Sequence, residues 1–188
     1  MTPRKMILLD PDLEPDAAPR SSAVKQTAAA MSPGLRVPSV RVLARFLNEA
    51  KAAVRLRGQV TVLLTTDNAI RNLNRRFRRK NKPTDVLSFP ADATAPGAER
   101  IAGDLAVSIP TARRQAAQQG HTLSAEIKVL MLHGLLHLAG YDHESDSGQM
   151  ERRERRLRAQ LGLPLGLIER TVALRRNALK PAAKARRP

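Results

Sequence analysis

This chain has no cysteine and no tryptophan, and its aromatic residues, three Phe and one Tyr, make up only 2% of the sequence. The lack of cysteine excludes disulfides and thiolate metal ligands, and it agrees with a reducing compartment. So few aromatic residues disfavour a base-stacking platform of the kind found in single-strand-binding proteins. If the chain binds nucleic acid, we therefore expect contacts to phosphates to dominate.

Long apolar runs are missing as well. No stretch approaches the roughly 18–20 apolar residues that span a membrane. The start, MTPRKMILLDPDLEPD, has an apolar patch too short and too acidic for a secretory signal. We expect a cytoplasmic protein with no membrane partner.

Negative charge is scarce relative to positive charge. Lys and Arg number 33 against 17 Asp and Glu, so the formal net charge is +16. A surface that served only solubility would keep the two signs closer to balance, so the excess predicts a polyanionic partner such as nucleic acid or the ribosome. A length of 188 residues predicts one domain with a proper core.

Three of the 4 histidines lie together in the stretch HGLLHLAGYDH. His133 and His137 are four residues apart, which places both on one face of a helix. Gly140 can end that helix and turn the chain back, so that His143 reaches the same point. The spacing predicts a metal site, because three imidazoles with a fourth position free are typical of catalytic zinc.

Two other interpretations of the histidines, as core residues and as a peptidase site, are less favoured than the metal site described above. A single histidine on an apolar helix is usually a core residue, but three at this spacing favour a metal. The spacing HxxxHxxGxxH also occurs in zinc peptidases, whose general base follows the first histidine. Here that position is Gly134, which cannot accept a proton, so a peptidase would need another glutamate, for example Glu126.

The composition divides the chain into three parts. Residues 1–38 hold a short strand near 5–10 and an Ala-, Pro- and Ser-rich insertion over 11–38 with little apolar surface to bury. Residues 39–164 carry the periodic patterns of a folded domain. Residues 165–188 form a basic tail that we expect to be helical in part, near 168–179.

Inside the domain, the patterns predict a helix over 39–54 and a strand over 59–65. A helix that begins at Thr66 or Asp67 should turn Ile70, Leu73 and Phe77 inward. Its other side is basic and resembles a phosphate-binding edge, with Arg71, Arg75, Arg76, Arg78, Arg79, Lys80 and Lys82. Strand-like runs over 85–89 and 103–109 should pair in one sheet.

Three more helices follow. Pro110 and Gly120 bracket the first, and Ser124 is expected to cap the second, which carries His133 and His137. This second helix is apolar nearly all round, so it should form the buried centre of the domain. The last should turn Met150, Leu157 and Leu161 inward and its arginines outward, namely Arg152, Arg153, Arg155, Arg156 and Arg158.

Three stretches together resemble a known family: LNRRFRRKNKPTDVLSFP from Leu73, AGDLAVS from Ala102, and HGLLHLAGYDH from His133. They are similar to the YbeY family, the bacterial rRNA maturation endoribonucleases, whose HGxLHLxGYDH pattern is matched at every fixed position. The likeness runs from about Val37 to Leu163. It implies a single α+β domain with a small central mixed sheet packed with helices, one of which is buried and bears the metal.

The resemblance also implies an activity. It places one zinc ion per chain on His133, His137 and His143, and it implies hydrolysis of single-stranded RNA in 16S rRNA 3′-end maturation and late ribosome quality control. The implied partners are rRNA and the small ribosomal subunit rather than DNA, together with a ribosomal protein or a ribosome-assembly GTPase.

Arg78 falls on the arginine of the family's first motif, after Phe77 where tyrosine is more common. A guanidinium can hold a phosphodiester at two points and stabilise the charge of its transition state, so Arg78 is the candidate catalytic residue. The alternative is one more surface arginine. The chain departs from the family in its insertion, its basic tail, and Ala102 where leucine is usual.

Two questions stay open at the level of sequence. The zinc could instead be structural, in a ribosome-assembly binding factor with little or no nuclease activity. In an enzyme, the proton acceptor could be bulk water, the phosphate, or a carboxylate such as Asp85, Asp142 or Glu144.

Overall fold

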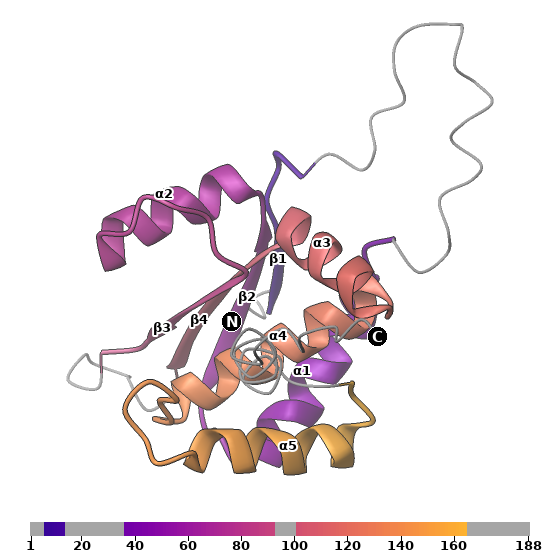
Figure 1. Ribbon diagram of the computed structural model, residues 1–188, viewed down its shortest axis with the longest axis vertical. Coiled ribbons are helices and arrows are strands. Elements are labelled where there is room, and N and C mark those ends of the chain that lie inside the picture. The colour runs from indigo at the N-terminus through magenta and orange to yellow at the C-terminus, as the bar shows by residue number, and fades with distance from the viewer. Residues whose placement is uncertain (1–5, 14–35, 93–100, 165–188) are drawn as a thin grey trace, which may run out of the picture.

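The computed structural model describes residues 6–13, 36–92 and 101–164 (Figure 1). Most of the predicted insertion and the whole basic tail, with its expected helix near 168–179, lie outside the described residues. The predicted division into three parts is therefore not tested.

The strands form one mixed sheet. β1 (Ile7–Leu9), β2 (Gln59–Thr65) and β4 (Ile101–Ser108) run parallel, while β3 (Val86–Pro90) is antiparallel to β4. The order across the sheet is β1-β2-β4-β3, so β3 lies at one edge. The pairing predicted for the runs 85–89 and 103–109 is confirmed.

Helices cover both faces of the sheet. The five described helices are α1 (Val40–Val54), α2 (Asp67–Arg78), α3 (Ile109–Gln119), α4 (Leu123–Leu138) and α5 (Gln149–Leu161). α1 and α4 pack on one face with α5 behind them, and α2 lies on the other face (Figure 1). This confirms the expected α+β class. None of the described helices has the length and apolar character needed to cross a membrane.

The core is built around α4, as the sequence predicted. Leu130, Leu132 and Leu135 on this helix have no exposed surface. β4 serves both faces of the sheet, because Leu105 packs toward α4 whereas Ala106 packs toward α2. The helix that carries two of the histidines is thus held on every side, which fixes the positions of their backbones.

The predicted start of α4 is wrong by two residues. Thr122, and not Ser124, caps the helix, and its hydroxyl accepts a hydrogen bond from the Ala125 amide at 3.1 Å. Ser124 already lies inside the helix. The hydroxyl of Thr122 and that of Ser124 could each cap a helix. Thr122 is the cap because its backbone is extended, as the N-cap position requires.

The predicted outward face of α5 is also wrong in part. Arg158 is 6% exposed, and the half-buried Arg153 donates a hydrogen bond to the Ala53 carbonyl of α1 at 3.0 Å. Helix α5 lies against α1, and this contact covers Arg153, whereas Arg158 donates a hydrogen bond to the Pro164 carbonyl just after α5.

Candidate functional site

Two of the predicted metal ligands lie one turn apart on α4. His133 is buried and His137 half-buried, and their ring centroids are 4.8 Å apart. The Nε2 atoms of the two rings face each other at 3.1 Å. The spacing of four residues therefore places both rings on the same face of α4, as helix geometry requires.

The turn after α4 positions the third predicted metal ligand, His143. Gly140 has a φ of +87°, a left-handed conformation that a side chain would strain, and the Tyr141 amide donates back to the Leu136 carbonyl at 3.1 Å. The chain reverses, and the His143 ring lies 5.2 Å from the rings of both His133 and His137. One ring nitrogen from each histidine lies within 4.8 Å of the others, so the cluster can hold a metal ion.

The donor set fits zinc. Ligands about 2.0–2.1 Å from a tetrahedral ion lie about 3.4 Å from one another, close to the 3.1 Å between the Nε2 atoms of His133 and His137. Three imidazoles and no thiolate are the donor set of several catalytic zinc sites, which keep a fourth position for water or substrate.

One residue of this site, Glu154, was not predicted from the sequence. Its carboxylate lies 3.2 Å from Nδ1 of His133, and the two side chains are only 1% and 4% exposed. A carboxylate on Nδ1 holds the proton there and turns Nε2 toward the ion, an arrangement common in metal sites. Glu154 stands among arginines in α5, so only the packing of α5 against α4 reveals its partner.

The site keeps His137 neutral. Burial first, and then the neighbouring imidazoles of His133 and His143, lower the pKa of His137 to about 4. Near neutral pH this ring is unprotonated, which is the state that binds a metal.

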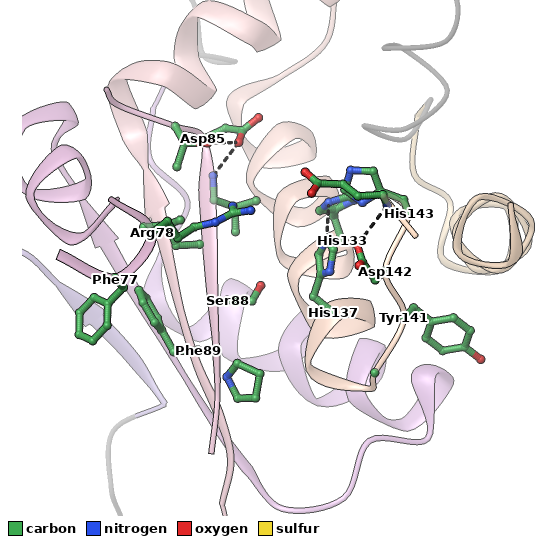
Figure 2. Close-up of a pocket in the computed structure, with 16 residues that line it drawn as sticks. Phe77, Arg78, Asp85, Ser88, Phe89, His133, His137, Tyr141, Asp142 and His143 are labelled. Atoms are coloured by element: carbon green, nitrogen blue, oxygen red, sulfur yellow. Dashed lines mark hydrogen bonds between the residues drawn. The ribbon is translucent and has the colours of Figure 1, made fainter. Parts of the chain in front are cut away.

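The histidines form one wall of a cavity of about 860 Å³, and strand β3 with the end of α2 forms the other (Figure 2). Small-molecule sites usually occupy about 300–1,000 Å³, so the cavity admits a ligand of nucleotide size. The lining on the β3 side includes Phe77, Arg78, Asp85, Ser88 and Phe89, and the lining on the α4 side includes His133, His137, Asp142, His143 and Glu144.

Gly134 lets α4 approach the sheet closely beside this cavity. A methyl group on Gly134 would lie 2.7 Å from Cδ2 of Leu105 and 3.2 Å from Oγ of Ser88. The Ser88 hydroxyl donates to the Gly134 carbonyl at 3.3 Å. The glycine that argued against a peptidase thus has a packing role between α4 and the sheet.

Arg78, the candidate catalytic residue, is the last residue of α2 and is exposed. Its side chain extends across β3 toward the histidine cluster (Figure 2). The structure therefore brings Arg78 and the three histidines to one cavity, although they lie far apart in the sequence.

The basic edge predicted along α2 is exposed, as expected, at all seven of its cations: Arg71, Arg75, Arg76, Arg78, Arg79, Lys80 and Lys82. None of them pairs with a carboxylate in the described part of the chain. Buried Asn74 secures the loop after α2, because its amide donates to the Lys82 carbonyl at 2.8 Å. The loop thus presents uncompensated positive charge beside the cavity.

Phe77 does not face inward, contrary to the prediction. It is 57% exposed, whereas Ile70 and Leu73 of the same stripe pack against the sheet. Strand β3 is the edge of the sheet, so the last turn of α2 has little beneath it except Phe89, whose ring centroid is 5.0 Å from that of Phe77.

The carboxylates considered as proton acceptors have different surroundings. Asp85 accepts hydrogen bonds from the Gln115 side chain at 2.9 Å and the Val86 amide at 2.8 Å, so it shapes the start of β3. The hydrogen bond from the Ser145 hydroxyl holds the pKa of Asp142 below its usual range, and Asp142 shapes the histidine loop.

Glu126, the glutamate that a peptidase would need, is buried and paired with His121 at 3.0 Å. It does not line the cavity. Glu126 also stands two helical turns before His133 on α4. The geometry therefore gives no support to a peptidase.

Comparisons with known proteins agree with the site. The family model described as Endoribonuclease YbeY matches residues 25–162. Proteins named Endoribonuclease YbeY from Koribacter versatilis (strain Ellin345) and Solibacter usitatus (strain Ellin6076) are each 50% identical, over 147 and 136 residues. The matches cover 78% of this chain and 89% of the first relative, and 72% and 86% for the second.

Among solved structures, the solution structure of a Thermotoga maritima protein matches with a TM-score of 0.48 and 23% identity, over 81% of this chain and 96% of that one.

Proposed function

This chain belongs to the YbeY family, and from that premise we propose that it is a zinc-dependent endoribonuclease that hydrolyses single-stranded RNA. The observation that carries the proposal is the convergence of three imidazoles on a cavity that Arg78 also lines. A metal and a guanidinium on opposite sides of one cavity suit phosphodiester chemistry, in which negative charge develops on the phosphate.

In this proposal His133, His137 and His143 hold one ion per chain, and Arg78 is the catalytic residue that grips a phosphate oxygen. Glu154 orients His133 through Nδ1. When bound, zinc supplies Lewis acidity to the phosphate and to water. Arg78 stands on the opposite wall from the histidines, so it can restrain the phosphate from the side that they do not reach.

The proposed biological role is 16S rRNA 3′-end maturation and late ribosome quality control in the cytoplasm. The partners would be rRNA, the small ribosomal subunit, and a ribosomal protein or assembly GTPase. Support comes from the net charge of +16, the exposed basic edge of α2, and the name of the family.

The first test measures cleavage of a single-stranded RNA fragment that spans the 16S 3′ end. The zinc-loaded full chain should cleave it, and a His133→Ala, His137→Ala variant with unchanged circular dichroism should not. Zinc content should fall from about one ion per chain to near zero in the variant. Equal cleavage by the two proteins would refute the metal-dependent mechanism.

The alternative is a ribosome-assembly binding factor whose zinc is structural. Arg78→Ala separates the two, with Arg71→Ala as a control that removes the same charge from the same helix outside the cavity. Loss of one donor to a transition-state oxyanion costs about 10²–10³-fold in kcat. We expect that loss only for Arg78→Ala, with ribosome binding retained; full maturation activity in this variant would favour the binding factor.

A further inference from the structure

The aromatic pair Phe77 and Phe89 has no role in the site as described so far. The chain has only three phenylalanines, and the third, Phe46, is 5% exposed in the core. Phe77 by contrast is 57% exposed, and it meets Phe89 edge to face with ring planes 66° apart. Phenylalanine is among the side chains most often buried in proteins, so an exposed ring that lines a cavity is a candidate contact for a ligand.

The aromatic pair belongs to the same cavity as the metal cluster. Phe77 immediately precedes Arg78, and Phe89 immediately follows Ser88, and all four residues line the wall opposite the histidines. Figure 2 shows the two rings side by side at the edge of the sheet on the α2 side of β3, with Arg78 beside them reaching across the strand toward the histidines. A ligand with a phosphate at Arg78 therefore has its adjoining groups within reach of the two rings.

Positive charge surrounds the pair. The Arg76 guanidinium lies 5.3 Å from the centroid of the Phe77 ring, and exposed Arg75, Arg79 and Lys80 stand on the same turn and the loop after it. Aromatic rings interleaved with cations are how proteins bind single-stranded nucleic acid, because the rings stack on bases while the cations follow the phosphates. A protein partner would instead favour a broader apolar surface.

We propose that Phe77 and Phe89 form a nucleobase subsite, in which one unpaired base of the RNA stacks on the exposed Phe77 ring while its phosphate lies at Arg78. The inference rests on the proposed RNA-cleaving function and adds a physical reason for single-strand selectivity. A base inside an A-form duplex is stacked on its neighbours and cannot offer its face to Phe77. Stacking is open to every base, so the subsite selects unpaired structure rather than sequence.

The chain offers a direct probe of stacking, because it contains no tryptophan. In the Phe77→Trp variant, all indole fluorescence comes from position 77. We expect a single-stranded RNA oligomer to quench this emission, and we expect the duplex form and an abasic oligomer of equal charge not to do so. The zinc-loaded full chain serves for these titrations, with oligomers whose phosphodiester bonds are chemically modified to resist cleavage, so that only binding is measured.

Affinity supplies the second measurement. Phe77→Ala should weaken binding of the single-stranded oligomer by about 5- to 140-fold, the effect of losing one stacked base. The dependence of affinity on salt should stay that of the parent, because no phosphate contact is removed. Val42→Ala, which trims an exposed apolar side chain on α1 outside the cavity, is the matched control and should leave affinity unchanged.

The possible outcomes distinguish a failure of the proposed subsite from a failure of the proposed RNA-cleaving function. If the parent cleaves RNA but Phe77→Ala binds as tightly as Val42→Ala, the subsite is wrong and the function stands. The same holds if Phe77→Ala loses affinity for ribosomal subunits yet keeps full affinity for the oligomer, since the pair would then contribute to ribosome binding and not to stacking on the single-stranded substrate. If the parent neither binds nor cleaves single-stranded RNA, the proposed function itself fails.

Discussion

The carboxylate behind His133 allows a sharp test of the metal site. Glu154→Gln keeps the shape of the side chain and its capacity to accept a hydrogen bond from Nδ1, but it removes a buried negative charge 3.2 Å from the imidazole. Loss of such a partner lowers metal affinity by about 10- to 100-fold, or about 1.4–2.8 kcal/mol. Because the amide can still hold the ring in place, we expect a loss of about tenfold, at the lower end of that range.

The affinity is best measured by competition for zinc against a chromophoric chelator at neutral pH. Glu151→Gln is the matched control, because it makes the same change one turn earlier on α5, away from the histidines. Cobalt substitution adds a second observable, since the intensity of its visible bands reports tetrahedral geometry. Circular dichroism checks that both variants are folded.

Equal zinc affinities in the Glu154→Gln and Glu151→Gln proteins would refute this role of Glu154. Identical cobalt spectra with a tenfold weaker affinity would mean that Glu154 acts through charge alone. A changed spectrum would mean that it also sets the orientation of the His133 ring. A Glu154→Leu variant, which has no acceptor at all, should extend the loss toward about 100-fold.

Three further predictions concern stability. Gly134→Ala overpacks the contact with Leu105 by about 1–3 kcal/mol but gains about 1 kcal/mol of helix propensity, so urea unfolding should show a net loss of about 1 kcal/mol. Leu105→Val should restore part of it, and a more stable Gly134→Ala protein would contradict the close approach. Burial raises the pKa of Asp67, but hydrogen bonds led by that from Ser108 outweigh it and hold the pKa below its usual 3.8. The stability it contributes is present above that pH and lost as pH falls through the lowered pKa, so the melting temperatures of parent and Asp67→Asn should converge below about pH 4. Asn74→Ala removes the bond to the basic loop and should cost about 1 kcal/mol in the same urea assay, whereas an unchanged midpoint would show that the loop is held otherwise.

Local patterns predicted most of the fold. The β-branched run over 59–65 is β2 at both ends, the helix predicted over 39–54 corresponds to α1, and Pro110 and Gly120 bracket α3 as the sequence predicted. These features depend on residues a few positions apart, and so does the histidine spacing. The sequence could therefore predict that His133, His137 and His143 converge.

The predictions failed where packing between elements that are distant in the sequence determines whether a side chain is buried or exposed. Phe77 keeps the helical period of an inward residue, but the sheet ends at β3 and leaves it exposed. Glu154 and Arg158 stand in a run of charged residues, but Glu154 is buried against His133 of α4 and Arg158 is buried where the chain after α5 folds back to offer the Pro164 carbonyl. The role proposed for Arg78 rests on family resemblance, because no local pattern separates it from the other arginines of α2.

The metal ligands and the rest of the site differ in how far apart they lie along the chain. All three histidines fall within α4 and the turn that Gly140 closes, so the cost in chain entropy of bringing them together is small. Arg78 and the aromatic pair reach the cavity only when the whole sheet has formed. With the proposed zinc bound, a partly denatured chain could thus retain the ion after the opposite wall is lost. Zinc content alone is then a poor gauge of the fraction of active protein in a preparation, and zinc should raise the melting temperature less than its affinity for the native chain would suggest.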